Sequence, residues 1–236
     1  MVLTEAEQNR IIKLIQQGVR HVFFSNDPDF LWGAGTCFVI KHVGSYYLMT
    51  ADHVITNLKA DYSDLRIFEQ GSKVALPFVE GFAPVRGVVH DDDEDFVIFK
   101  IDDGLYFQRS KQRIVAWDFS LARPASILPM GTKICFAGFP SASETYEDYE
   151  RSIIRPLLHM RIGELASSDL GEGFYSIVDI ESPISGDGFS GAPVFWMHED
   201  GLKLVGMIIR GSSSGHILHF IDIHFIRNML LTYERR

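Results

Sequence analysis

Cysteine is nearly absent from this sequence, which contains only Cys37 and Cys135. Both lie inside apolar runs and lack the paired spacing of metal-binding cysteines, which excludes a disulfide scaffold and a zinc site of paired cysteines. Long hydrophobic runs are absent as well, because no stretch reaches the roughly 18 apolar residues of a membrane-spanning helix. We therefore expect buried free thiols and no membrane partner.

Positive charge is scarce. Lys and Arg number 22 against 31 Asp and Glu, so the net charge is −9. The chain thus lacks the basic patch that binding to phosphate backbones requires, and we expect no nucleic-acid partner. Residues 1–10 also lack the basic-then-apolar pattern of a secretion signal, which predicts a cytoplasmic protein.

Short β-rich runs separated by Gly, Asn, Asp and Pro dominate the 236 residues, which correspond to one large domain or two small ones. Helices do not alternate with these runs, which argues against a parallel α/β fold and favours an all-β antiparallel sandwich or barrel. A linker is expected at 105–128 and a long polar loop at 141–155. Strands are expected at 21–24, 36–41, 46–50, 65–68, 73–79 and 96–101, then at 132–139, 153–162, 174–181, 192–197, 202–210 and 216–221.

A helix is predicted at each end of the chain. Thr4 and Glu7 form a capping-box pattern ahead of apolar residues at helical spacing, which predicts a helix over 4–18. Asp222 is the expected N-cap of a second helix over 223–233. The first helix either covers the β structure or docks a partner.

Three segments carry the chemistry. Thr50-Ala51-Asp52-His53 supplies a base, Asp95 before an apolar strand supplies a carboxylate, and Gly188-Phe189-Ser190-Gly191-Ala192-Pro193 supplies a nucleophile. A serine hydroxyl needs a neighbouring imidazole to take its proton, and the imidazole needs a carboxylate to hold its tautomer. Gly188 permits a turn in which its own amide and that of Ser190 bind a developing oxyanion.

Two alternatives compete with this assignment. Asp91, Asp92, Asp93 and Glu94 compete with Asp95, which we prefer because it directly abuts the strand that fixes its backbone. An α/β-hydrolase elbow needs a glycine where Ala192 stands and a helix after it, whereas the following residues are strand-like.

These motifs, in the order His, Asp, Ser, resemble the chymotrypsin-like (trypsin-fold) serine peptidases, and most closely the bacterial branch with HtrA-type protease domains, here without a PDZ domain. The resemblance spans roughly residues 20–236. It implies two six-stranded antiparallel Greek-key barrels, catalytic His53, Asp95 and Ser190, and an oxyanion hole of Gly188 and Ser190. The implied division is 1–20 for the N-terminal helix, 21–115 for the first barrel, 116–221 for the second and 222–236 for the C-terminal helix.

The resemblance also places the specificity pocket by position relative to Ser190. The base is expected at Ile184, which disfavours a buried Lys or Arg and predicts a small or medium apolar side chain before the scissile bond. The residues expected to bind substrate are Ile184, Ser185, Asp187, Ile209, Arg210 and Gly211.

One departure from the digestive relatives concerns activation. In those enzymes an aspartate before the nucleophile pairs with a newly cut N-terminus, whereas Phe189 stands here. We therefore expect the full chain to be active without proteolytic maturation.

The sequence predicts a serine endopeptidase that acts on a protein or peptide substrate and needs no metal or organic cofactor. It does not indicate an oligomeric state. The alternatives are a catalytically silent protease-fold module that binds a peptide or protein partner, and an esterase of small acyl substrates.

Overall fold

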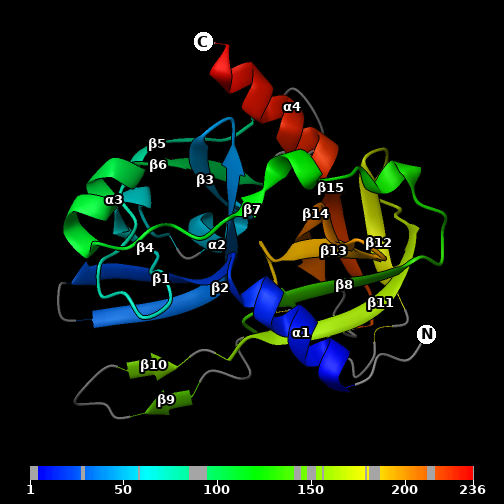
Figure 1. Ribbon diagram of the computed structural model, residues 1–236, viewed down its shortest axis with the longest axis horizontal. Coiled ribbons are helices and arrows are strands. Elements are labelled where there is room, and N and C mark those ends of the chain that lie inside the picture. The colour runs from blue at the N-terminus through cyan, green and yellow to red at the C-terminus, as the bar shows by residue number, and fades with distance from the viewer. Residues whose placement is uncertain are drawn as a thin grey trace.

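Two β units lie side by side in the computed structural model, with helices at the two ends of the chain (Figure 1). The structure describes residues 5–27, 30–57, 59–84, 95–140, 145–147, 153–155, 157–178, 180, 187–211 and 216–235. The first unit supplies His53 and Asp95, and the second supplies Ser190.

The first unit is a curled seven-stranded sheet with the order β4-β1-β2-β3-β6-β5, to which β7 adds in parallel beside β2. The chain between β4 and β5 folds back through a bridge from Phe68 to Ala75, but these two edge strands do not pair. Within the described residues the sheet therefore stays open between them. Its strands are β1 (Val19–Asp27), β2 (Phe30–His42), β3 (Ser45–Thr50), β4 (Leu65–Arg66), β5 (Phe78–Phe82), β6 (Val97–Ile101) and β7 (Trp117–Asp118).

The second unit is a closed barrel in the order β11-β12-β15-β14-β13-β8. All of its pairings are antiparallel. Closure leaves no free strand edge in this barrel, so the backbone of each strand is held from both sides. Its strands are β8 (Lys133–Gly138), β11 (His159–Ser167), β12 (Phe174–Val178), β13 (Pro193–His198), β14 (Gly201–Gly211) and β15 (Leu218–Asp222).

The prediction of an all-β fold with two units and terminal helices is confirmed, and all strand pairs among the described residues are antiparallel except β2 with β7. One detail is corrected: the first unit is an open curled sheet in the described residues, because β4 and β5 diverge instead of pairing.

The helices are α1 (Glu5–Gln16), α2 (His53–Thr56), α3 (Asp103–Ser110) and α4 (Ile223–Glu234), with short 3-10 turns η1 (Tyr62–Asp64), η2 (Phe119–Leu121) and η3 (Ala125–Ile127).

The expected linker and loop contain short elements that the sequence pattern did not reveal. Helix α3 and strand β7 lie within 105–128 or at its border, and α3 buries only Tyr106, so its apolar signal is weak. A hairpin of β9 (Thr145–Glu147) and β10 (Ile153–Arg155) occupies part of 141–155 and interrupts the strand expected over 153–162. Thr4 of the proposed capping box lies outside the described residues.

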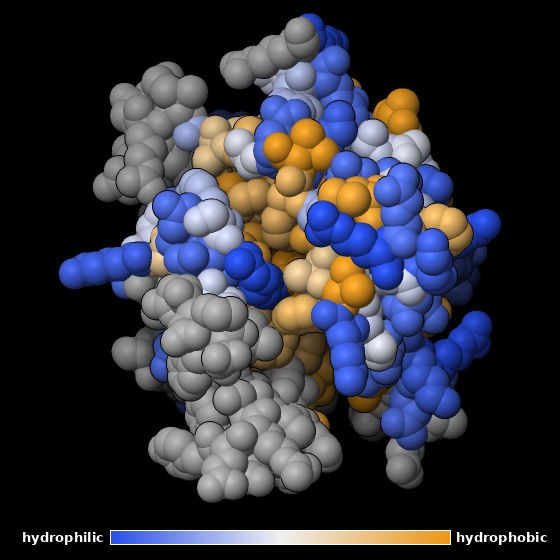
Figure 2. All heavy atoms as spheres, turned by 90° about the vertical axis from the view of Figure 1, so that its left-hand side faces the viewer, coloured by the Kyte–Doolittle hydropathy of each residue, from blue (hydrophilic) through white to orange (hydrophobic). Residues whose placement is uncertain are grey.

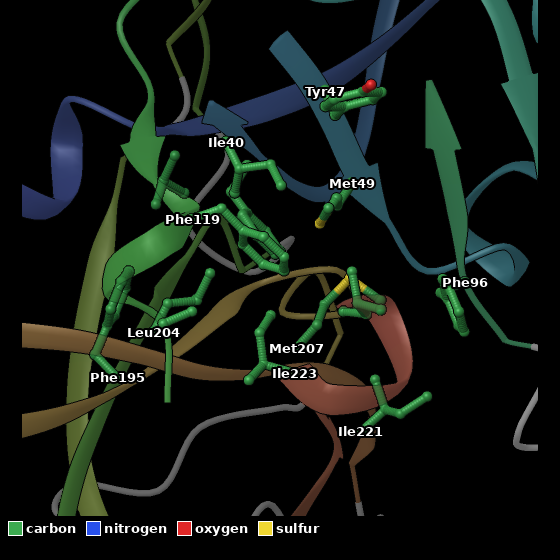
Figure 3. Close-up of a cluster of buried hydrophobic side chains, with 14 of the residues drawn as sticks. Ile40, Tyr47, Met49, Phe96, Phe119, Phe195, Leu204, Met207, Ile221 and Ile223 are labelled. Atoms are coloured by element: carbon green, nitrogen blue, oxygen red, sulfur yellow. The ribbon is translucent and has the colours of Figure 1, made fainter. Parts of the chain in front are cut away.

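A hydrophobic core joins the two units. Figure 3 shows Met49 of the first sheet and Met207 of the second barrel in one cluster with Phe119, from the connection between them. All three side chains are at most 1% exposed. Because apolar burial of this kind is lost if the units separate, the packing fixes how His53 and Ser190 face each other.

Helix α4 bridges the two units. Its N-terminus follows β15, where the Asp222 carboxylate accepts a hydrogen bond from the His224 amide at 2.7 Å, which confirms the predicted N-cap. Its C-terminal end reaches the first sheet: the Tyr233 ring stacks on Phe82 with centroids 4.0 Å apart, and Tyr47 Oη donates to Glu234 Oε1 at 3.0 Å. Burial and this carboxylate raise the pKa of Tyr47 to about 12.

Candidate active site

The structure brings His53, Asp95 and Ser190 into one hydrogen-bonded chain. His53 Nδ1 lies 2.7 Å from Asp95 Oδ2, and His53 Nε2 lies 2.8 Å from Ser190 Oγ. An ionised carboxylate can only accept, so Nδ1 carries the proton and the lone pair of Nε2 faces the serine hydroxyl. The geometry therefore suits the imidazole to remove a proton from Ser190.

Local backbone structure sets the position of the base. β3 ends at Thr50, and the chain turns through Ala51 and Asp52 into α2, whose first residue is His53. The His53 amide donates to Asp95 Oδ1 at 3.0 Å, so the carboxylate holds both the backbone and the ring of the same residue. The side chain of His53 is 31% exposed and that of Asp95 is 18% exposed, which leaves the ring accessible with the acid behind it.

The turn that carries Ser190 needs two glycines. Gly188 has φ +90° and Gly191 has φ +83°, both in the left-handed region that favours glycine. The Ala192 amide donates to the Phe189 carbonyl at 2.8 Å, which closes the turn. The Gly191 amide donates to the Ile208 carbonyl at 2.8 Å, which ties the turn to β14.

Phe189 anchors this turn in the core of the barrel. Its side chain is 1% exposed and packs edge-to-face on Phe136, with ring centroids 5.1 Å apart. Apolar packing thus occupies the position where the digestive relatives use a charged aspartate.

The amides of Gly188 and Ser190 are the two expected oxyanion donors. No residue in the described part of the chain accepts a hydrogen bond from either amide. The Gly188 carbonyl instead accepts from Thr36 Oγ1 at 2.7 Å, which turns this oxygen toward β2. Among the described residues, both amides are thus left without an acceptor.

Thr36 and Thr50 support the site, and sequence reasoning gave neither a role. Thr36 Oγ1 also accepts from the Phe139 amide at 2.9 Å, and the Thr36 amide donates to the Ser190 carbonyl at 3.0 Å. Thr50 Oγ1 donates to the Thr36 carbonyl at 2.8 Å. A Cβ at Gly191 would clash with that same carbonyl, so the two units touch closely here. In the sequence, the only hint of these roles that we identify is that each threonine lies in a strand that is otherwise mostly apolar.

The residues expected to bind substrate are only partly described. Ile184 and Ser185 lie outside the described residues. Ile209 is fully buried in the core between the units, at a bulge of β14, while Arg210 and Gly211 after it are exposed, as is Asp187.

Other chemistry at this site has little support in the described part of the chain. It contains no group of three His, Cys, Asp or Glu side chains arranged to hold a metal ion. Both cysteines are fully buried, and burial raises the pKa of Cys135 to about 12 and that of Cys37 further. Such buried, protonated thiols are poor nucleophiles.

Comparison with known proteins agrees with this geometry. The family model described as "Trypsin-like peptidase domain" matches residues 35–207, from Gly35 in β2 to Met207 in β14. A comparison with curated proteins finds no significant match. The matched region covers most of the chain, spans parts of both β units and includes His53, Asp95 and Ser190; the chain belongs to the trypsin-like peptidase family.

Proposed function

We propose that this protein is a serine endopeptidase that uses Ser190, His53 and Asp95. The observation that carries the proposal is the hydrogen-bonded chain from Ser190 Oγ through both ring nitrogens of His53 to Asp95, with links of 2.8 and 2.7 Å. Family membership supports the same reaction class.

The reaction follows from this arrangement. Ser190 Oγ attacks the peptide carbonyl carbon while its proton passes to His53 Nε2, and Asp95 stabilises the imidazolium. The carbonyl oxygen becomes an oxyanion that the amides of Gly188 and Ser190 stabilise. His53 then protonates the leaving amine as the C–N bond breaks, and water hydrolyses the acyl-enzyme by the same base.

Finer parts of the proposal rest on the sequence. An apolar side chain before the scissile bond is expected from Ile184, and a library cleavage profile dominated by Lys or Arg would contradict that preference. A cytoplasmic location and likeness to the bacterial HtrA-type branch are retained on the same basis.

Activity without maturation is part of the proposal and is supported by Phe189. Its packing on Phe136 holds the nucleophile turn without an ion pair to a new N-terminus. The uncleaved chain should therefore hydrolyse peptides, and activity that requires N-terminal cleavage would contradict this.

Labelling with a fluorophosphonate tests the proposal directly. The native chain should be labelled, and Ser190→Ala should abolish both labelling and peptide cleavage. Ser167→Ala is the matched control, because Ser167 is an exposed serine at the end of β11. A folded native chain that stays unlabelled yet binds peptides would favour the silent module instead, and cleavage of esters alone would favour an esterase.

A further inference from the structure

A groove of about 460 Å³ lies where the first sheet remains open, lined by residues of both edge strands, β4 and β5, and by η1, β6 and α3. We call it the β4–β5 groove. Figure 2 looks onto this side of the molecule and shows apolar side chains gathered in a hollow between hydrophilic margins.

Aromatic rings form one wall of the β4–β5 groove. Tyr62 packs edge-to-face on Phe99 with centroids 5.5 Å apart, and Phe78 lies 5.2 Å from the same ring. Val79, the extra residue of a bulge in β5, is 59% exposed beside them. An exposed aliphatic side chain next to aromatic rings gives a ligand apolar surface to bury.

Arginines at the rim give the groove a charge opposite to that of the whole chain. Arg66 donates through Nη1 to the carbonyls of Ser63 and Leu65, at 2.7 and 2.9 Å. Arg109 on α3 is exposed and makes no hydrogen bond or ion pair with the described residues. Glu80 is the lining carboxylate, and it lies opposite Lys100 in the β5–β6 ladder.

The β4–β5 groove lies near His53, the proposed general base. Tyr62 Oη donates to Asp52 Oδ1 at 2.8 Å, and Asp52 is the residue before His53. One hydrogen bond therefore joins the groove lining directly to the residue before His53. This position favours a second segment of the substrate as the occupant.

We propose that the β4–β5 groove binds a segment of the protein substrate, separate from the scissile residues, that combines carboxylates with aliphatic or aromatic side chains. The carboxylates pair with Arg66 and Arg109, whose planar guanidinium groups suit carboxylate geometry. The apolar side chains cover Val79 and the ring of Tyr62. This inference rests on the proposed endopeptidase function for its substrate, while its binding test does not require activity.

Binding is measured first, on the Ser190→Ala chain, by fluorescence anisotropy of a fluorescein-labelled peptide EDFEEIEDFEEI. Arg66→Ala and Arg109→Ala should each weaken binding about tenfold, because each removes a charge-assisted hydrogen bond. A peptide with every acidic residue changed to lysine should not bind. Equal affinity of all variants, or equal binding of the lysine peptide, would overturn the proposal.

Arg123→Ala is the matched control for Arg66→Ala. Arg123 Nη1 donates to the carbonyls three and one residues before it, those of Ser120 and Ala122, just as Arg66 does, but Arg123 is not part of the groove lining. Loss of peptide binding in Arg123→Ala to the same extent would show that the groove is not responsible. Thermal unfolding of each variant checks that it remains folded.

Cleavage then tests whether the occupant belongs to the substrate. A cleavable peptide carrying the acidic segment should have a kcat/KM about tenfold above that of the same peptide with a Ser-Gly tail, and Arg66→Ala with Arg109→Ala should remove that advantage. If the acidic segment binds but gives no advantage, substrate docking is wrong. If fluorophosphonate labelling fails while the acidic peptide binds, the endopeptidase function fails and the groove remains a binding site.

Discussion

The two β units hold the proposed catalytic residues in different ways. In the closed second barrel, backbone hydrogen bonds between the Ser190 turn and Ile208 position the nucleophile, with Gly191 donating to Ile208 and Ile208 to Ala192, both at 2.8 Å. In the open first sheet, the side chain of Asp95 holds the backbone and ring of His53. Main-chain hydrogen bonds thus hold Ser190, whereas a side chain holds His53, so we expect the position of His53 to be the more sensitive to a single substitution.

The largest expected effect comes from breaking the side-chain link in the first unit. Asp95→Asn should lower kcat about 10⁴-fold, the size of effect known for this change in well-studied enzymes of the fold, because the amide favours the wrong tautomer of His53. Steady-state kinetics with a peptide substrate measure the loss. Asp103→Asn, at an exposed position on α3, serves as control, and a loss below tenfold for Asp95→Asn would argue against its proposed role.

A second change tests the anchoring of the nucleophile turn in the barrel core. Phe189→Ala should reduce the free energy of unfolding by about 3–5 kcal/mol, because it removes a buried aromatic side chain and leaves a cavity. Phe107→Ala is the matched control, because Phe107 is 51% exposed. Urea unfolding of both variants gives the comparison, and similar small losses for the two would show that Phe189 is not an anchor.

The smallest effect is expected at Thr36, a residue of the first unit whose side chain donates a hydrogen bond to Gly188 of the second. Thr36→Val keeps the shape of the residue but removes the donor to Gly188 and the acceptor for Phe139. We expect a loss of about 1–3 kcal/mol in the free energy of unfolding. Because the Gly188 turn loosens, kcat should fall more than KM changes. Thr132→Val is the control, because it also removes a hydroxyl hydrogen bond, to the Pro129 carbonyl, but outside the Ser190 turn, and it should leave kcat unchanged. An unaltered kcat in Thr36→Val would separate Thr36 from the oxyanion turn.

Local patterns were sufficient for most strands and for the terminal helices, because apolar periodicity and turn residues determine them directly. The strand expected over 73–79 was misplaced, since β5 runs from Phe78 to Phe82, and the strand expected over 153–162 is interrupted. The hydrogen bond that the His224 amide donates to Asp222 could be predicted, because the N-cap signal lies in neighbouring residues. The three segments of the candidate site could be identified because each has its own motif. Sequence alone could not predict their distances, which depend on the packing of Met49 against Met207 across the two units.

Features formed by distant residues escaped the sequence analysis. The roles of Thr36 and Thr50 arise only when β2 and β3 meet the Ser190 turn; Thr50 belongs to the His53 motif, but that motif does not reveal its bond to Thr36. The β4–β5 groove depends on the divergence of two edge strands, which the strand propensity of individual residues does not predict. Helix α3 was missed because a single buried residue, Tyr106, gives little periodicity.

Helix α4 has a consequence for how the molecule unfolds. It starts from the last strand of the barrel and ends with Tyr233 on Phe82 and Glu234 on Tyr47 of the first sheet. Neither unit can open fully without detaching this helix, so stability is shared between them and denaturation should be cooperative across the whole chain. Loss of the C-terminal turn would then disturb the alignment of His53 with Ser190 without touching either residue.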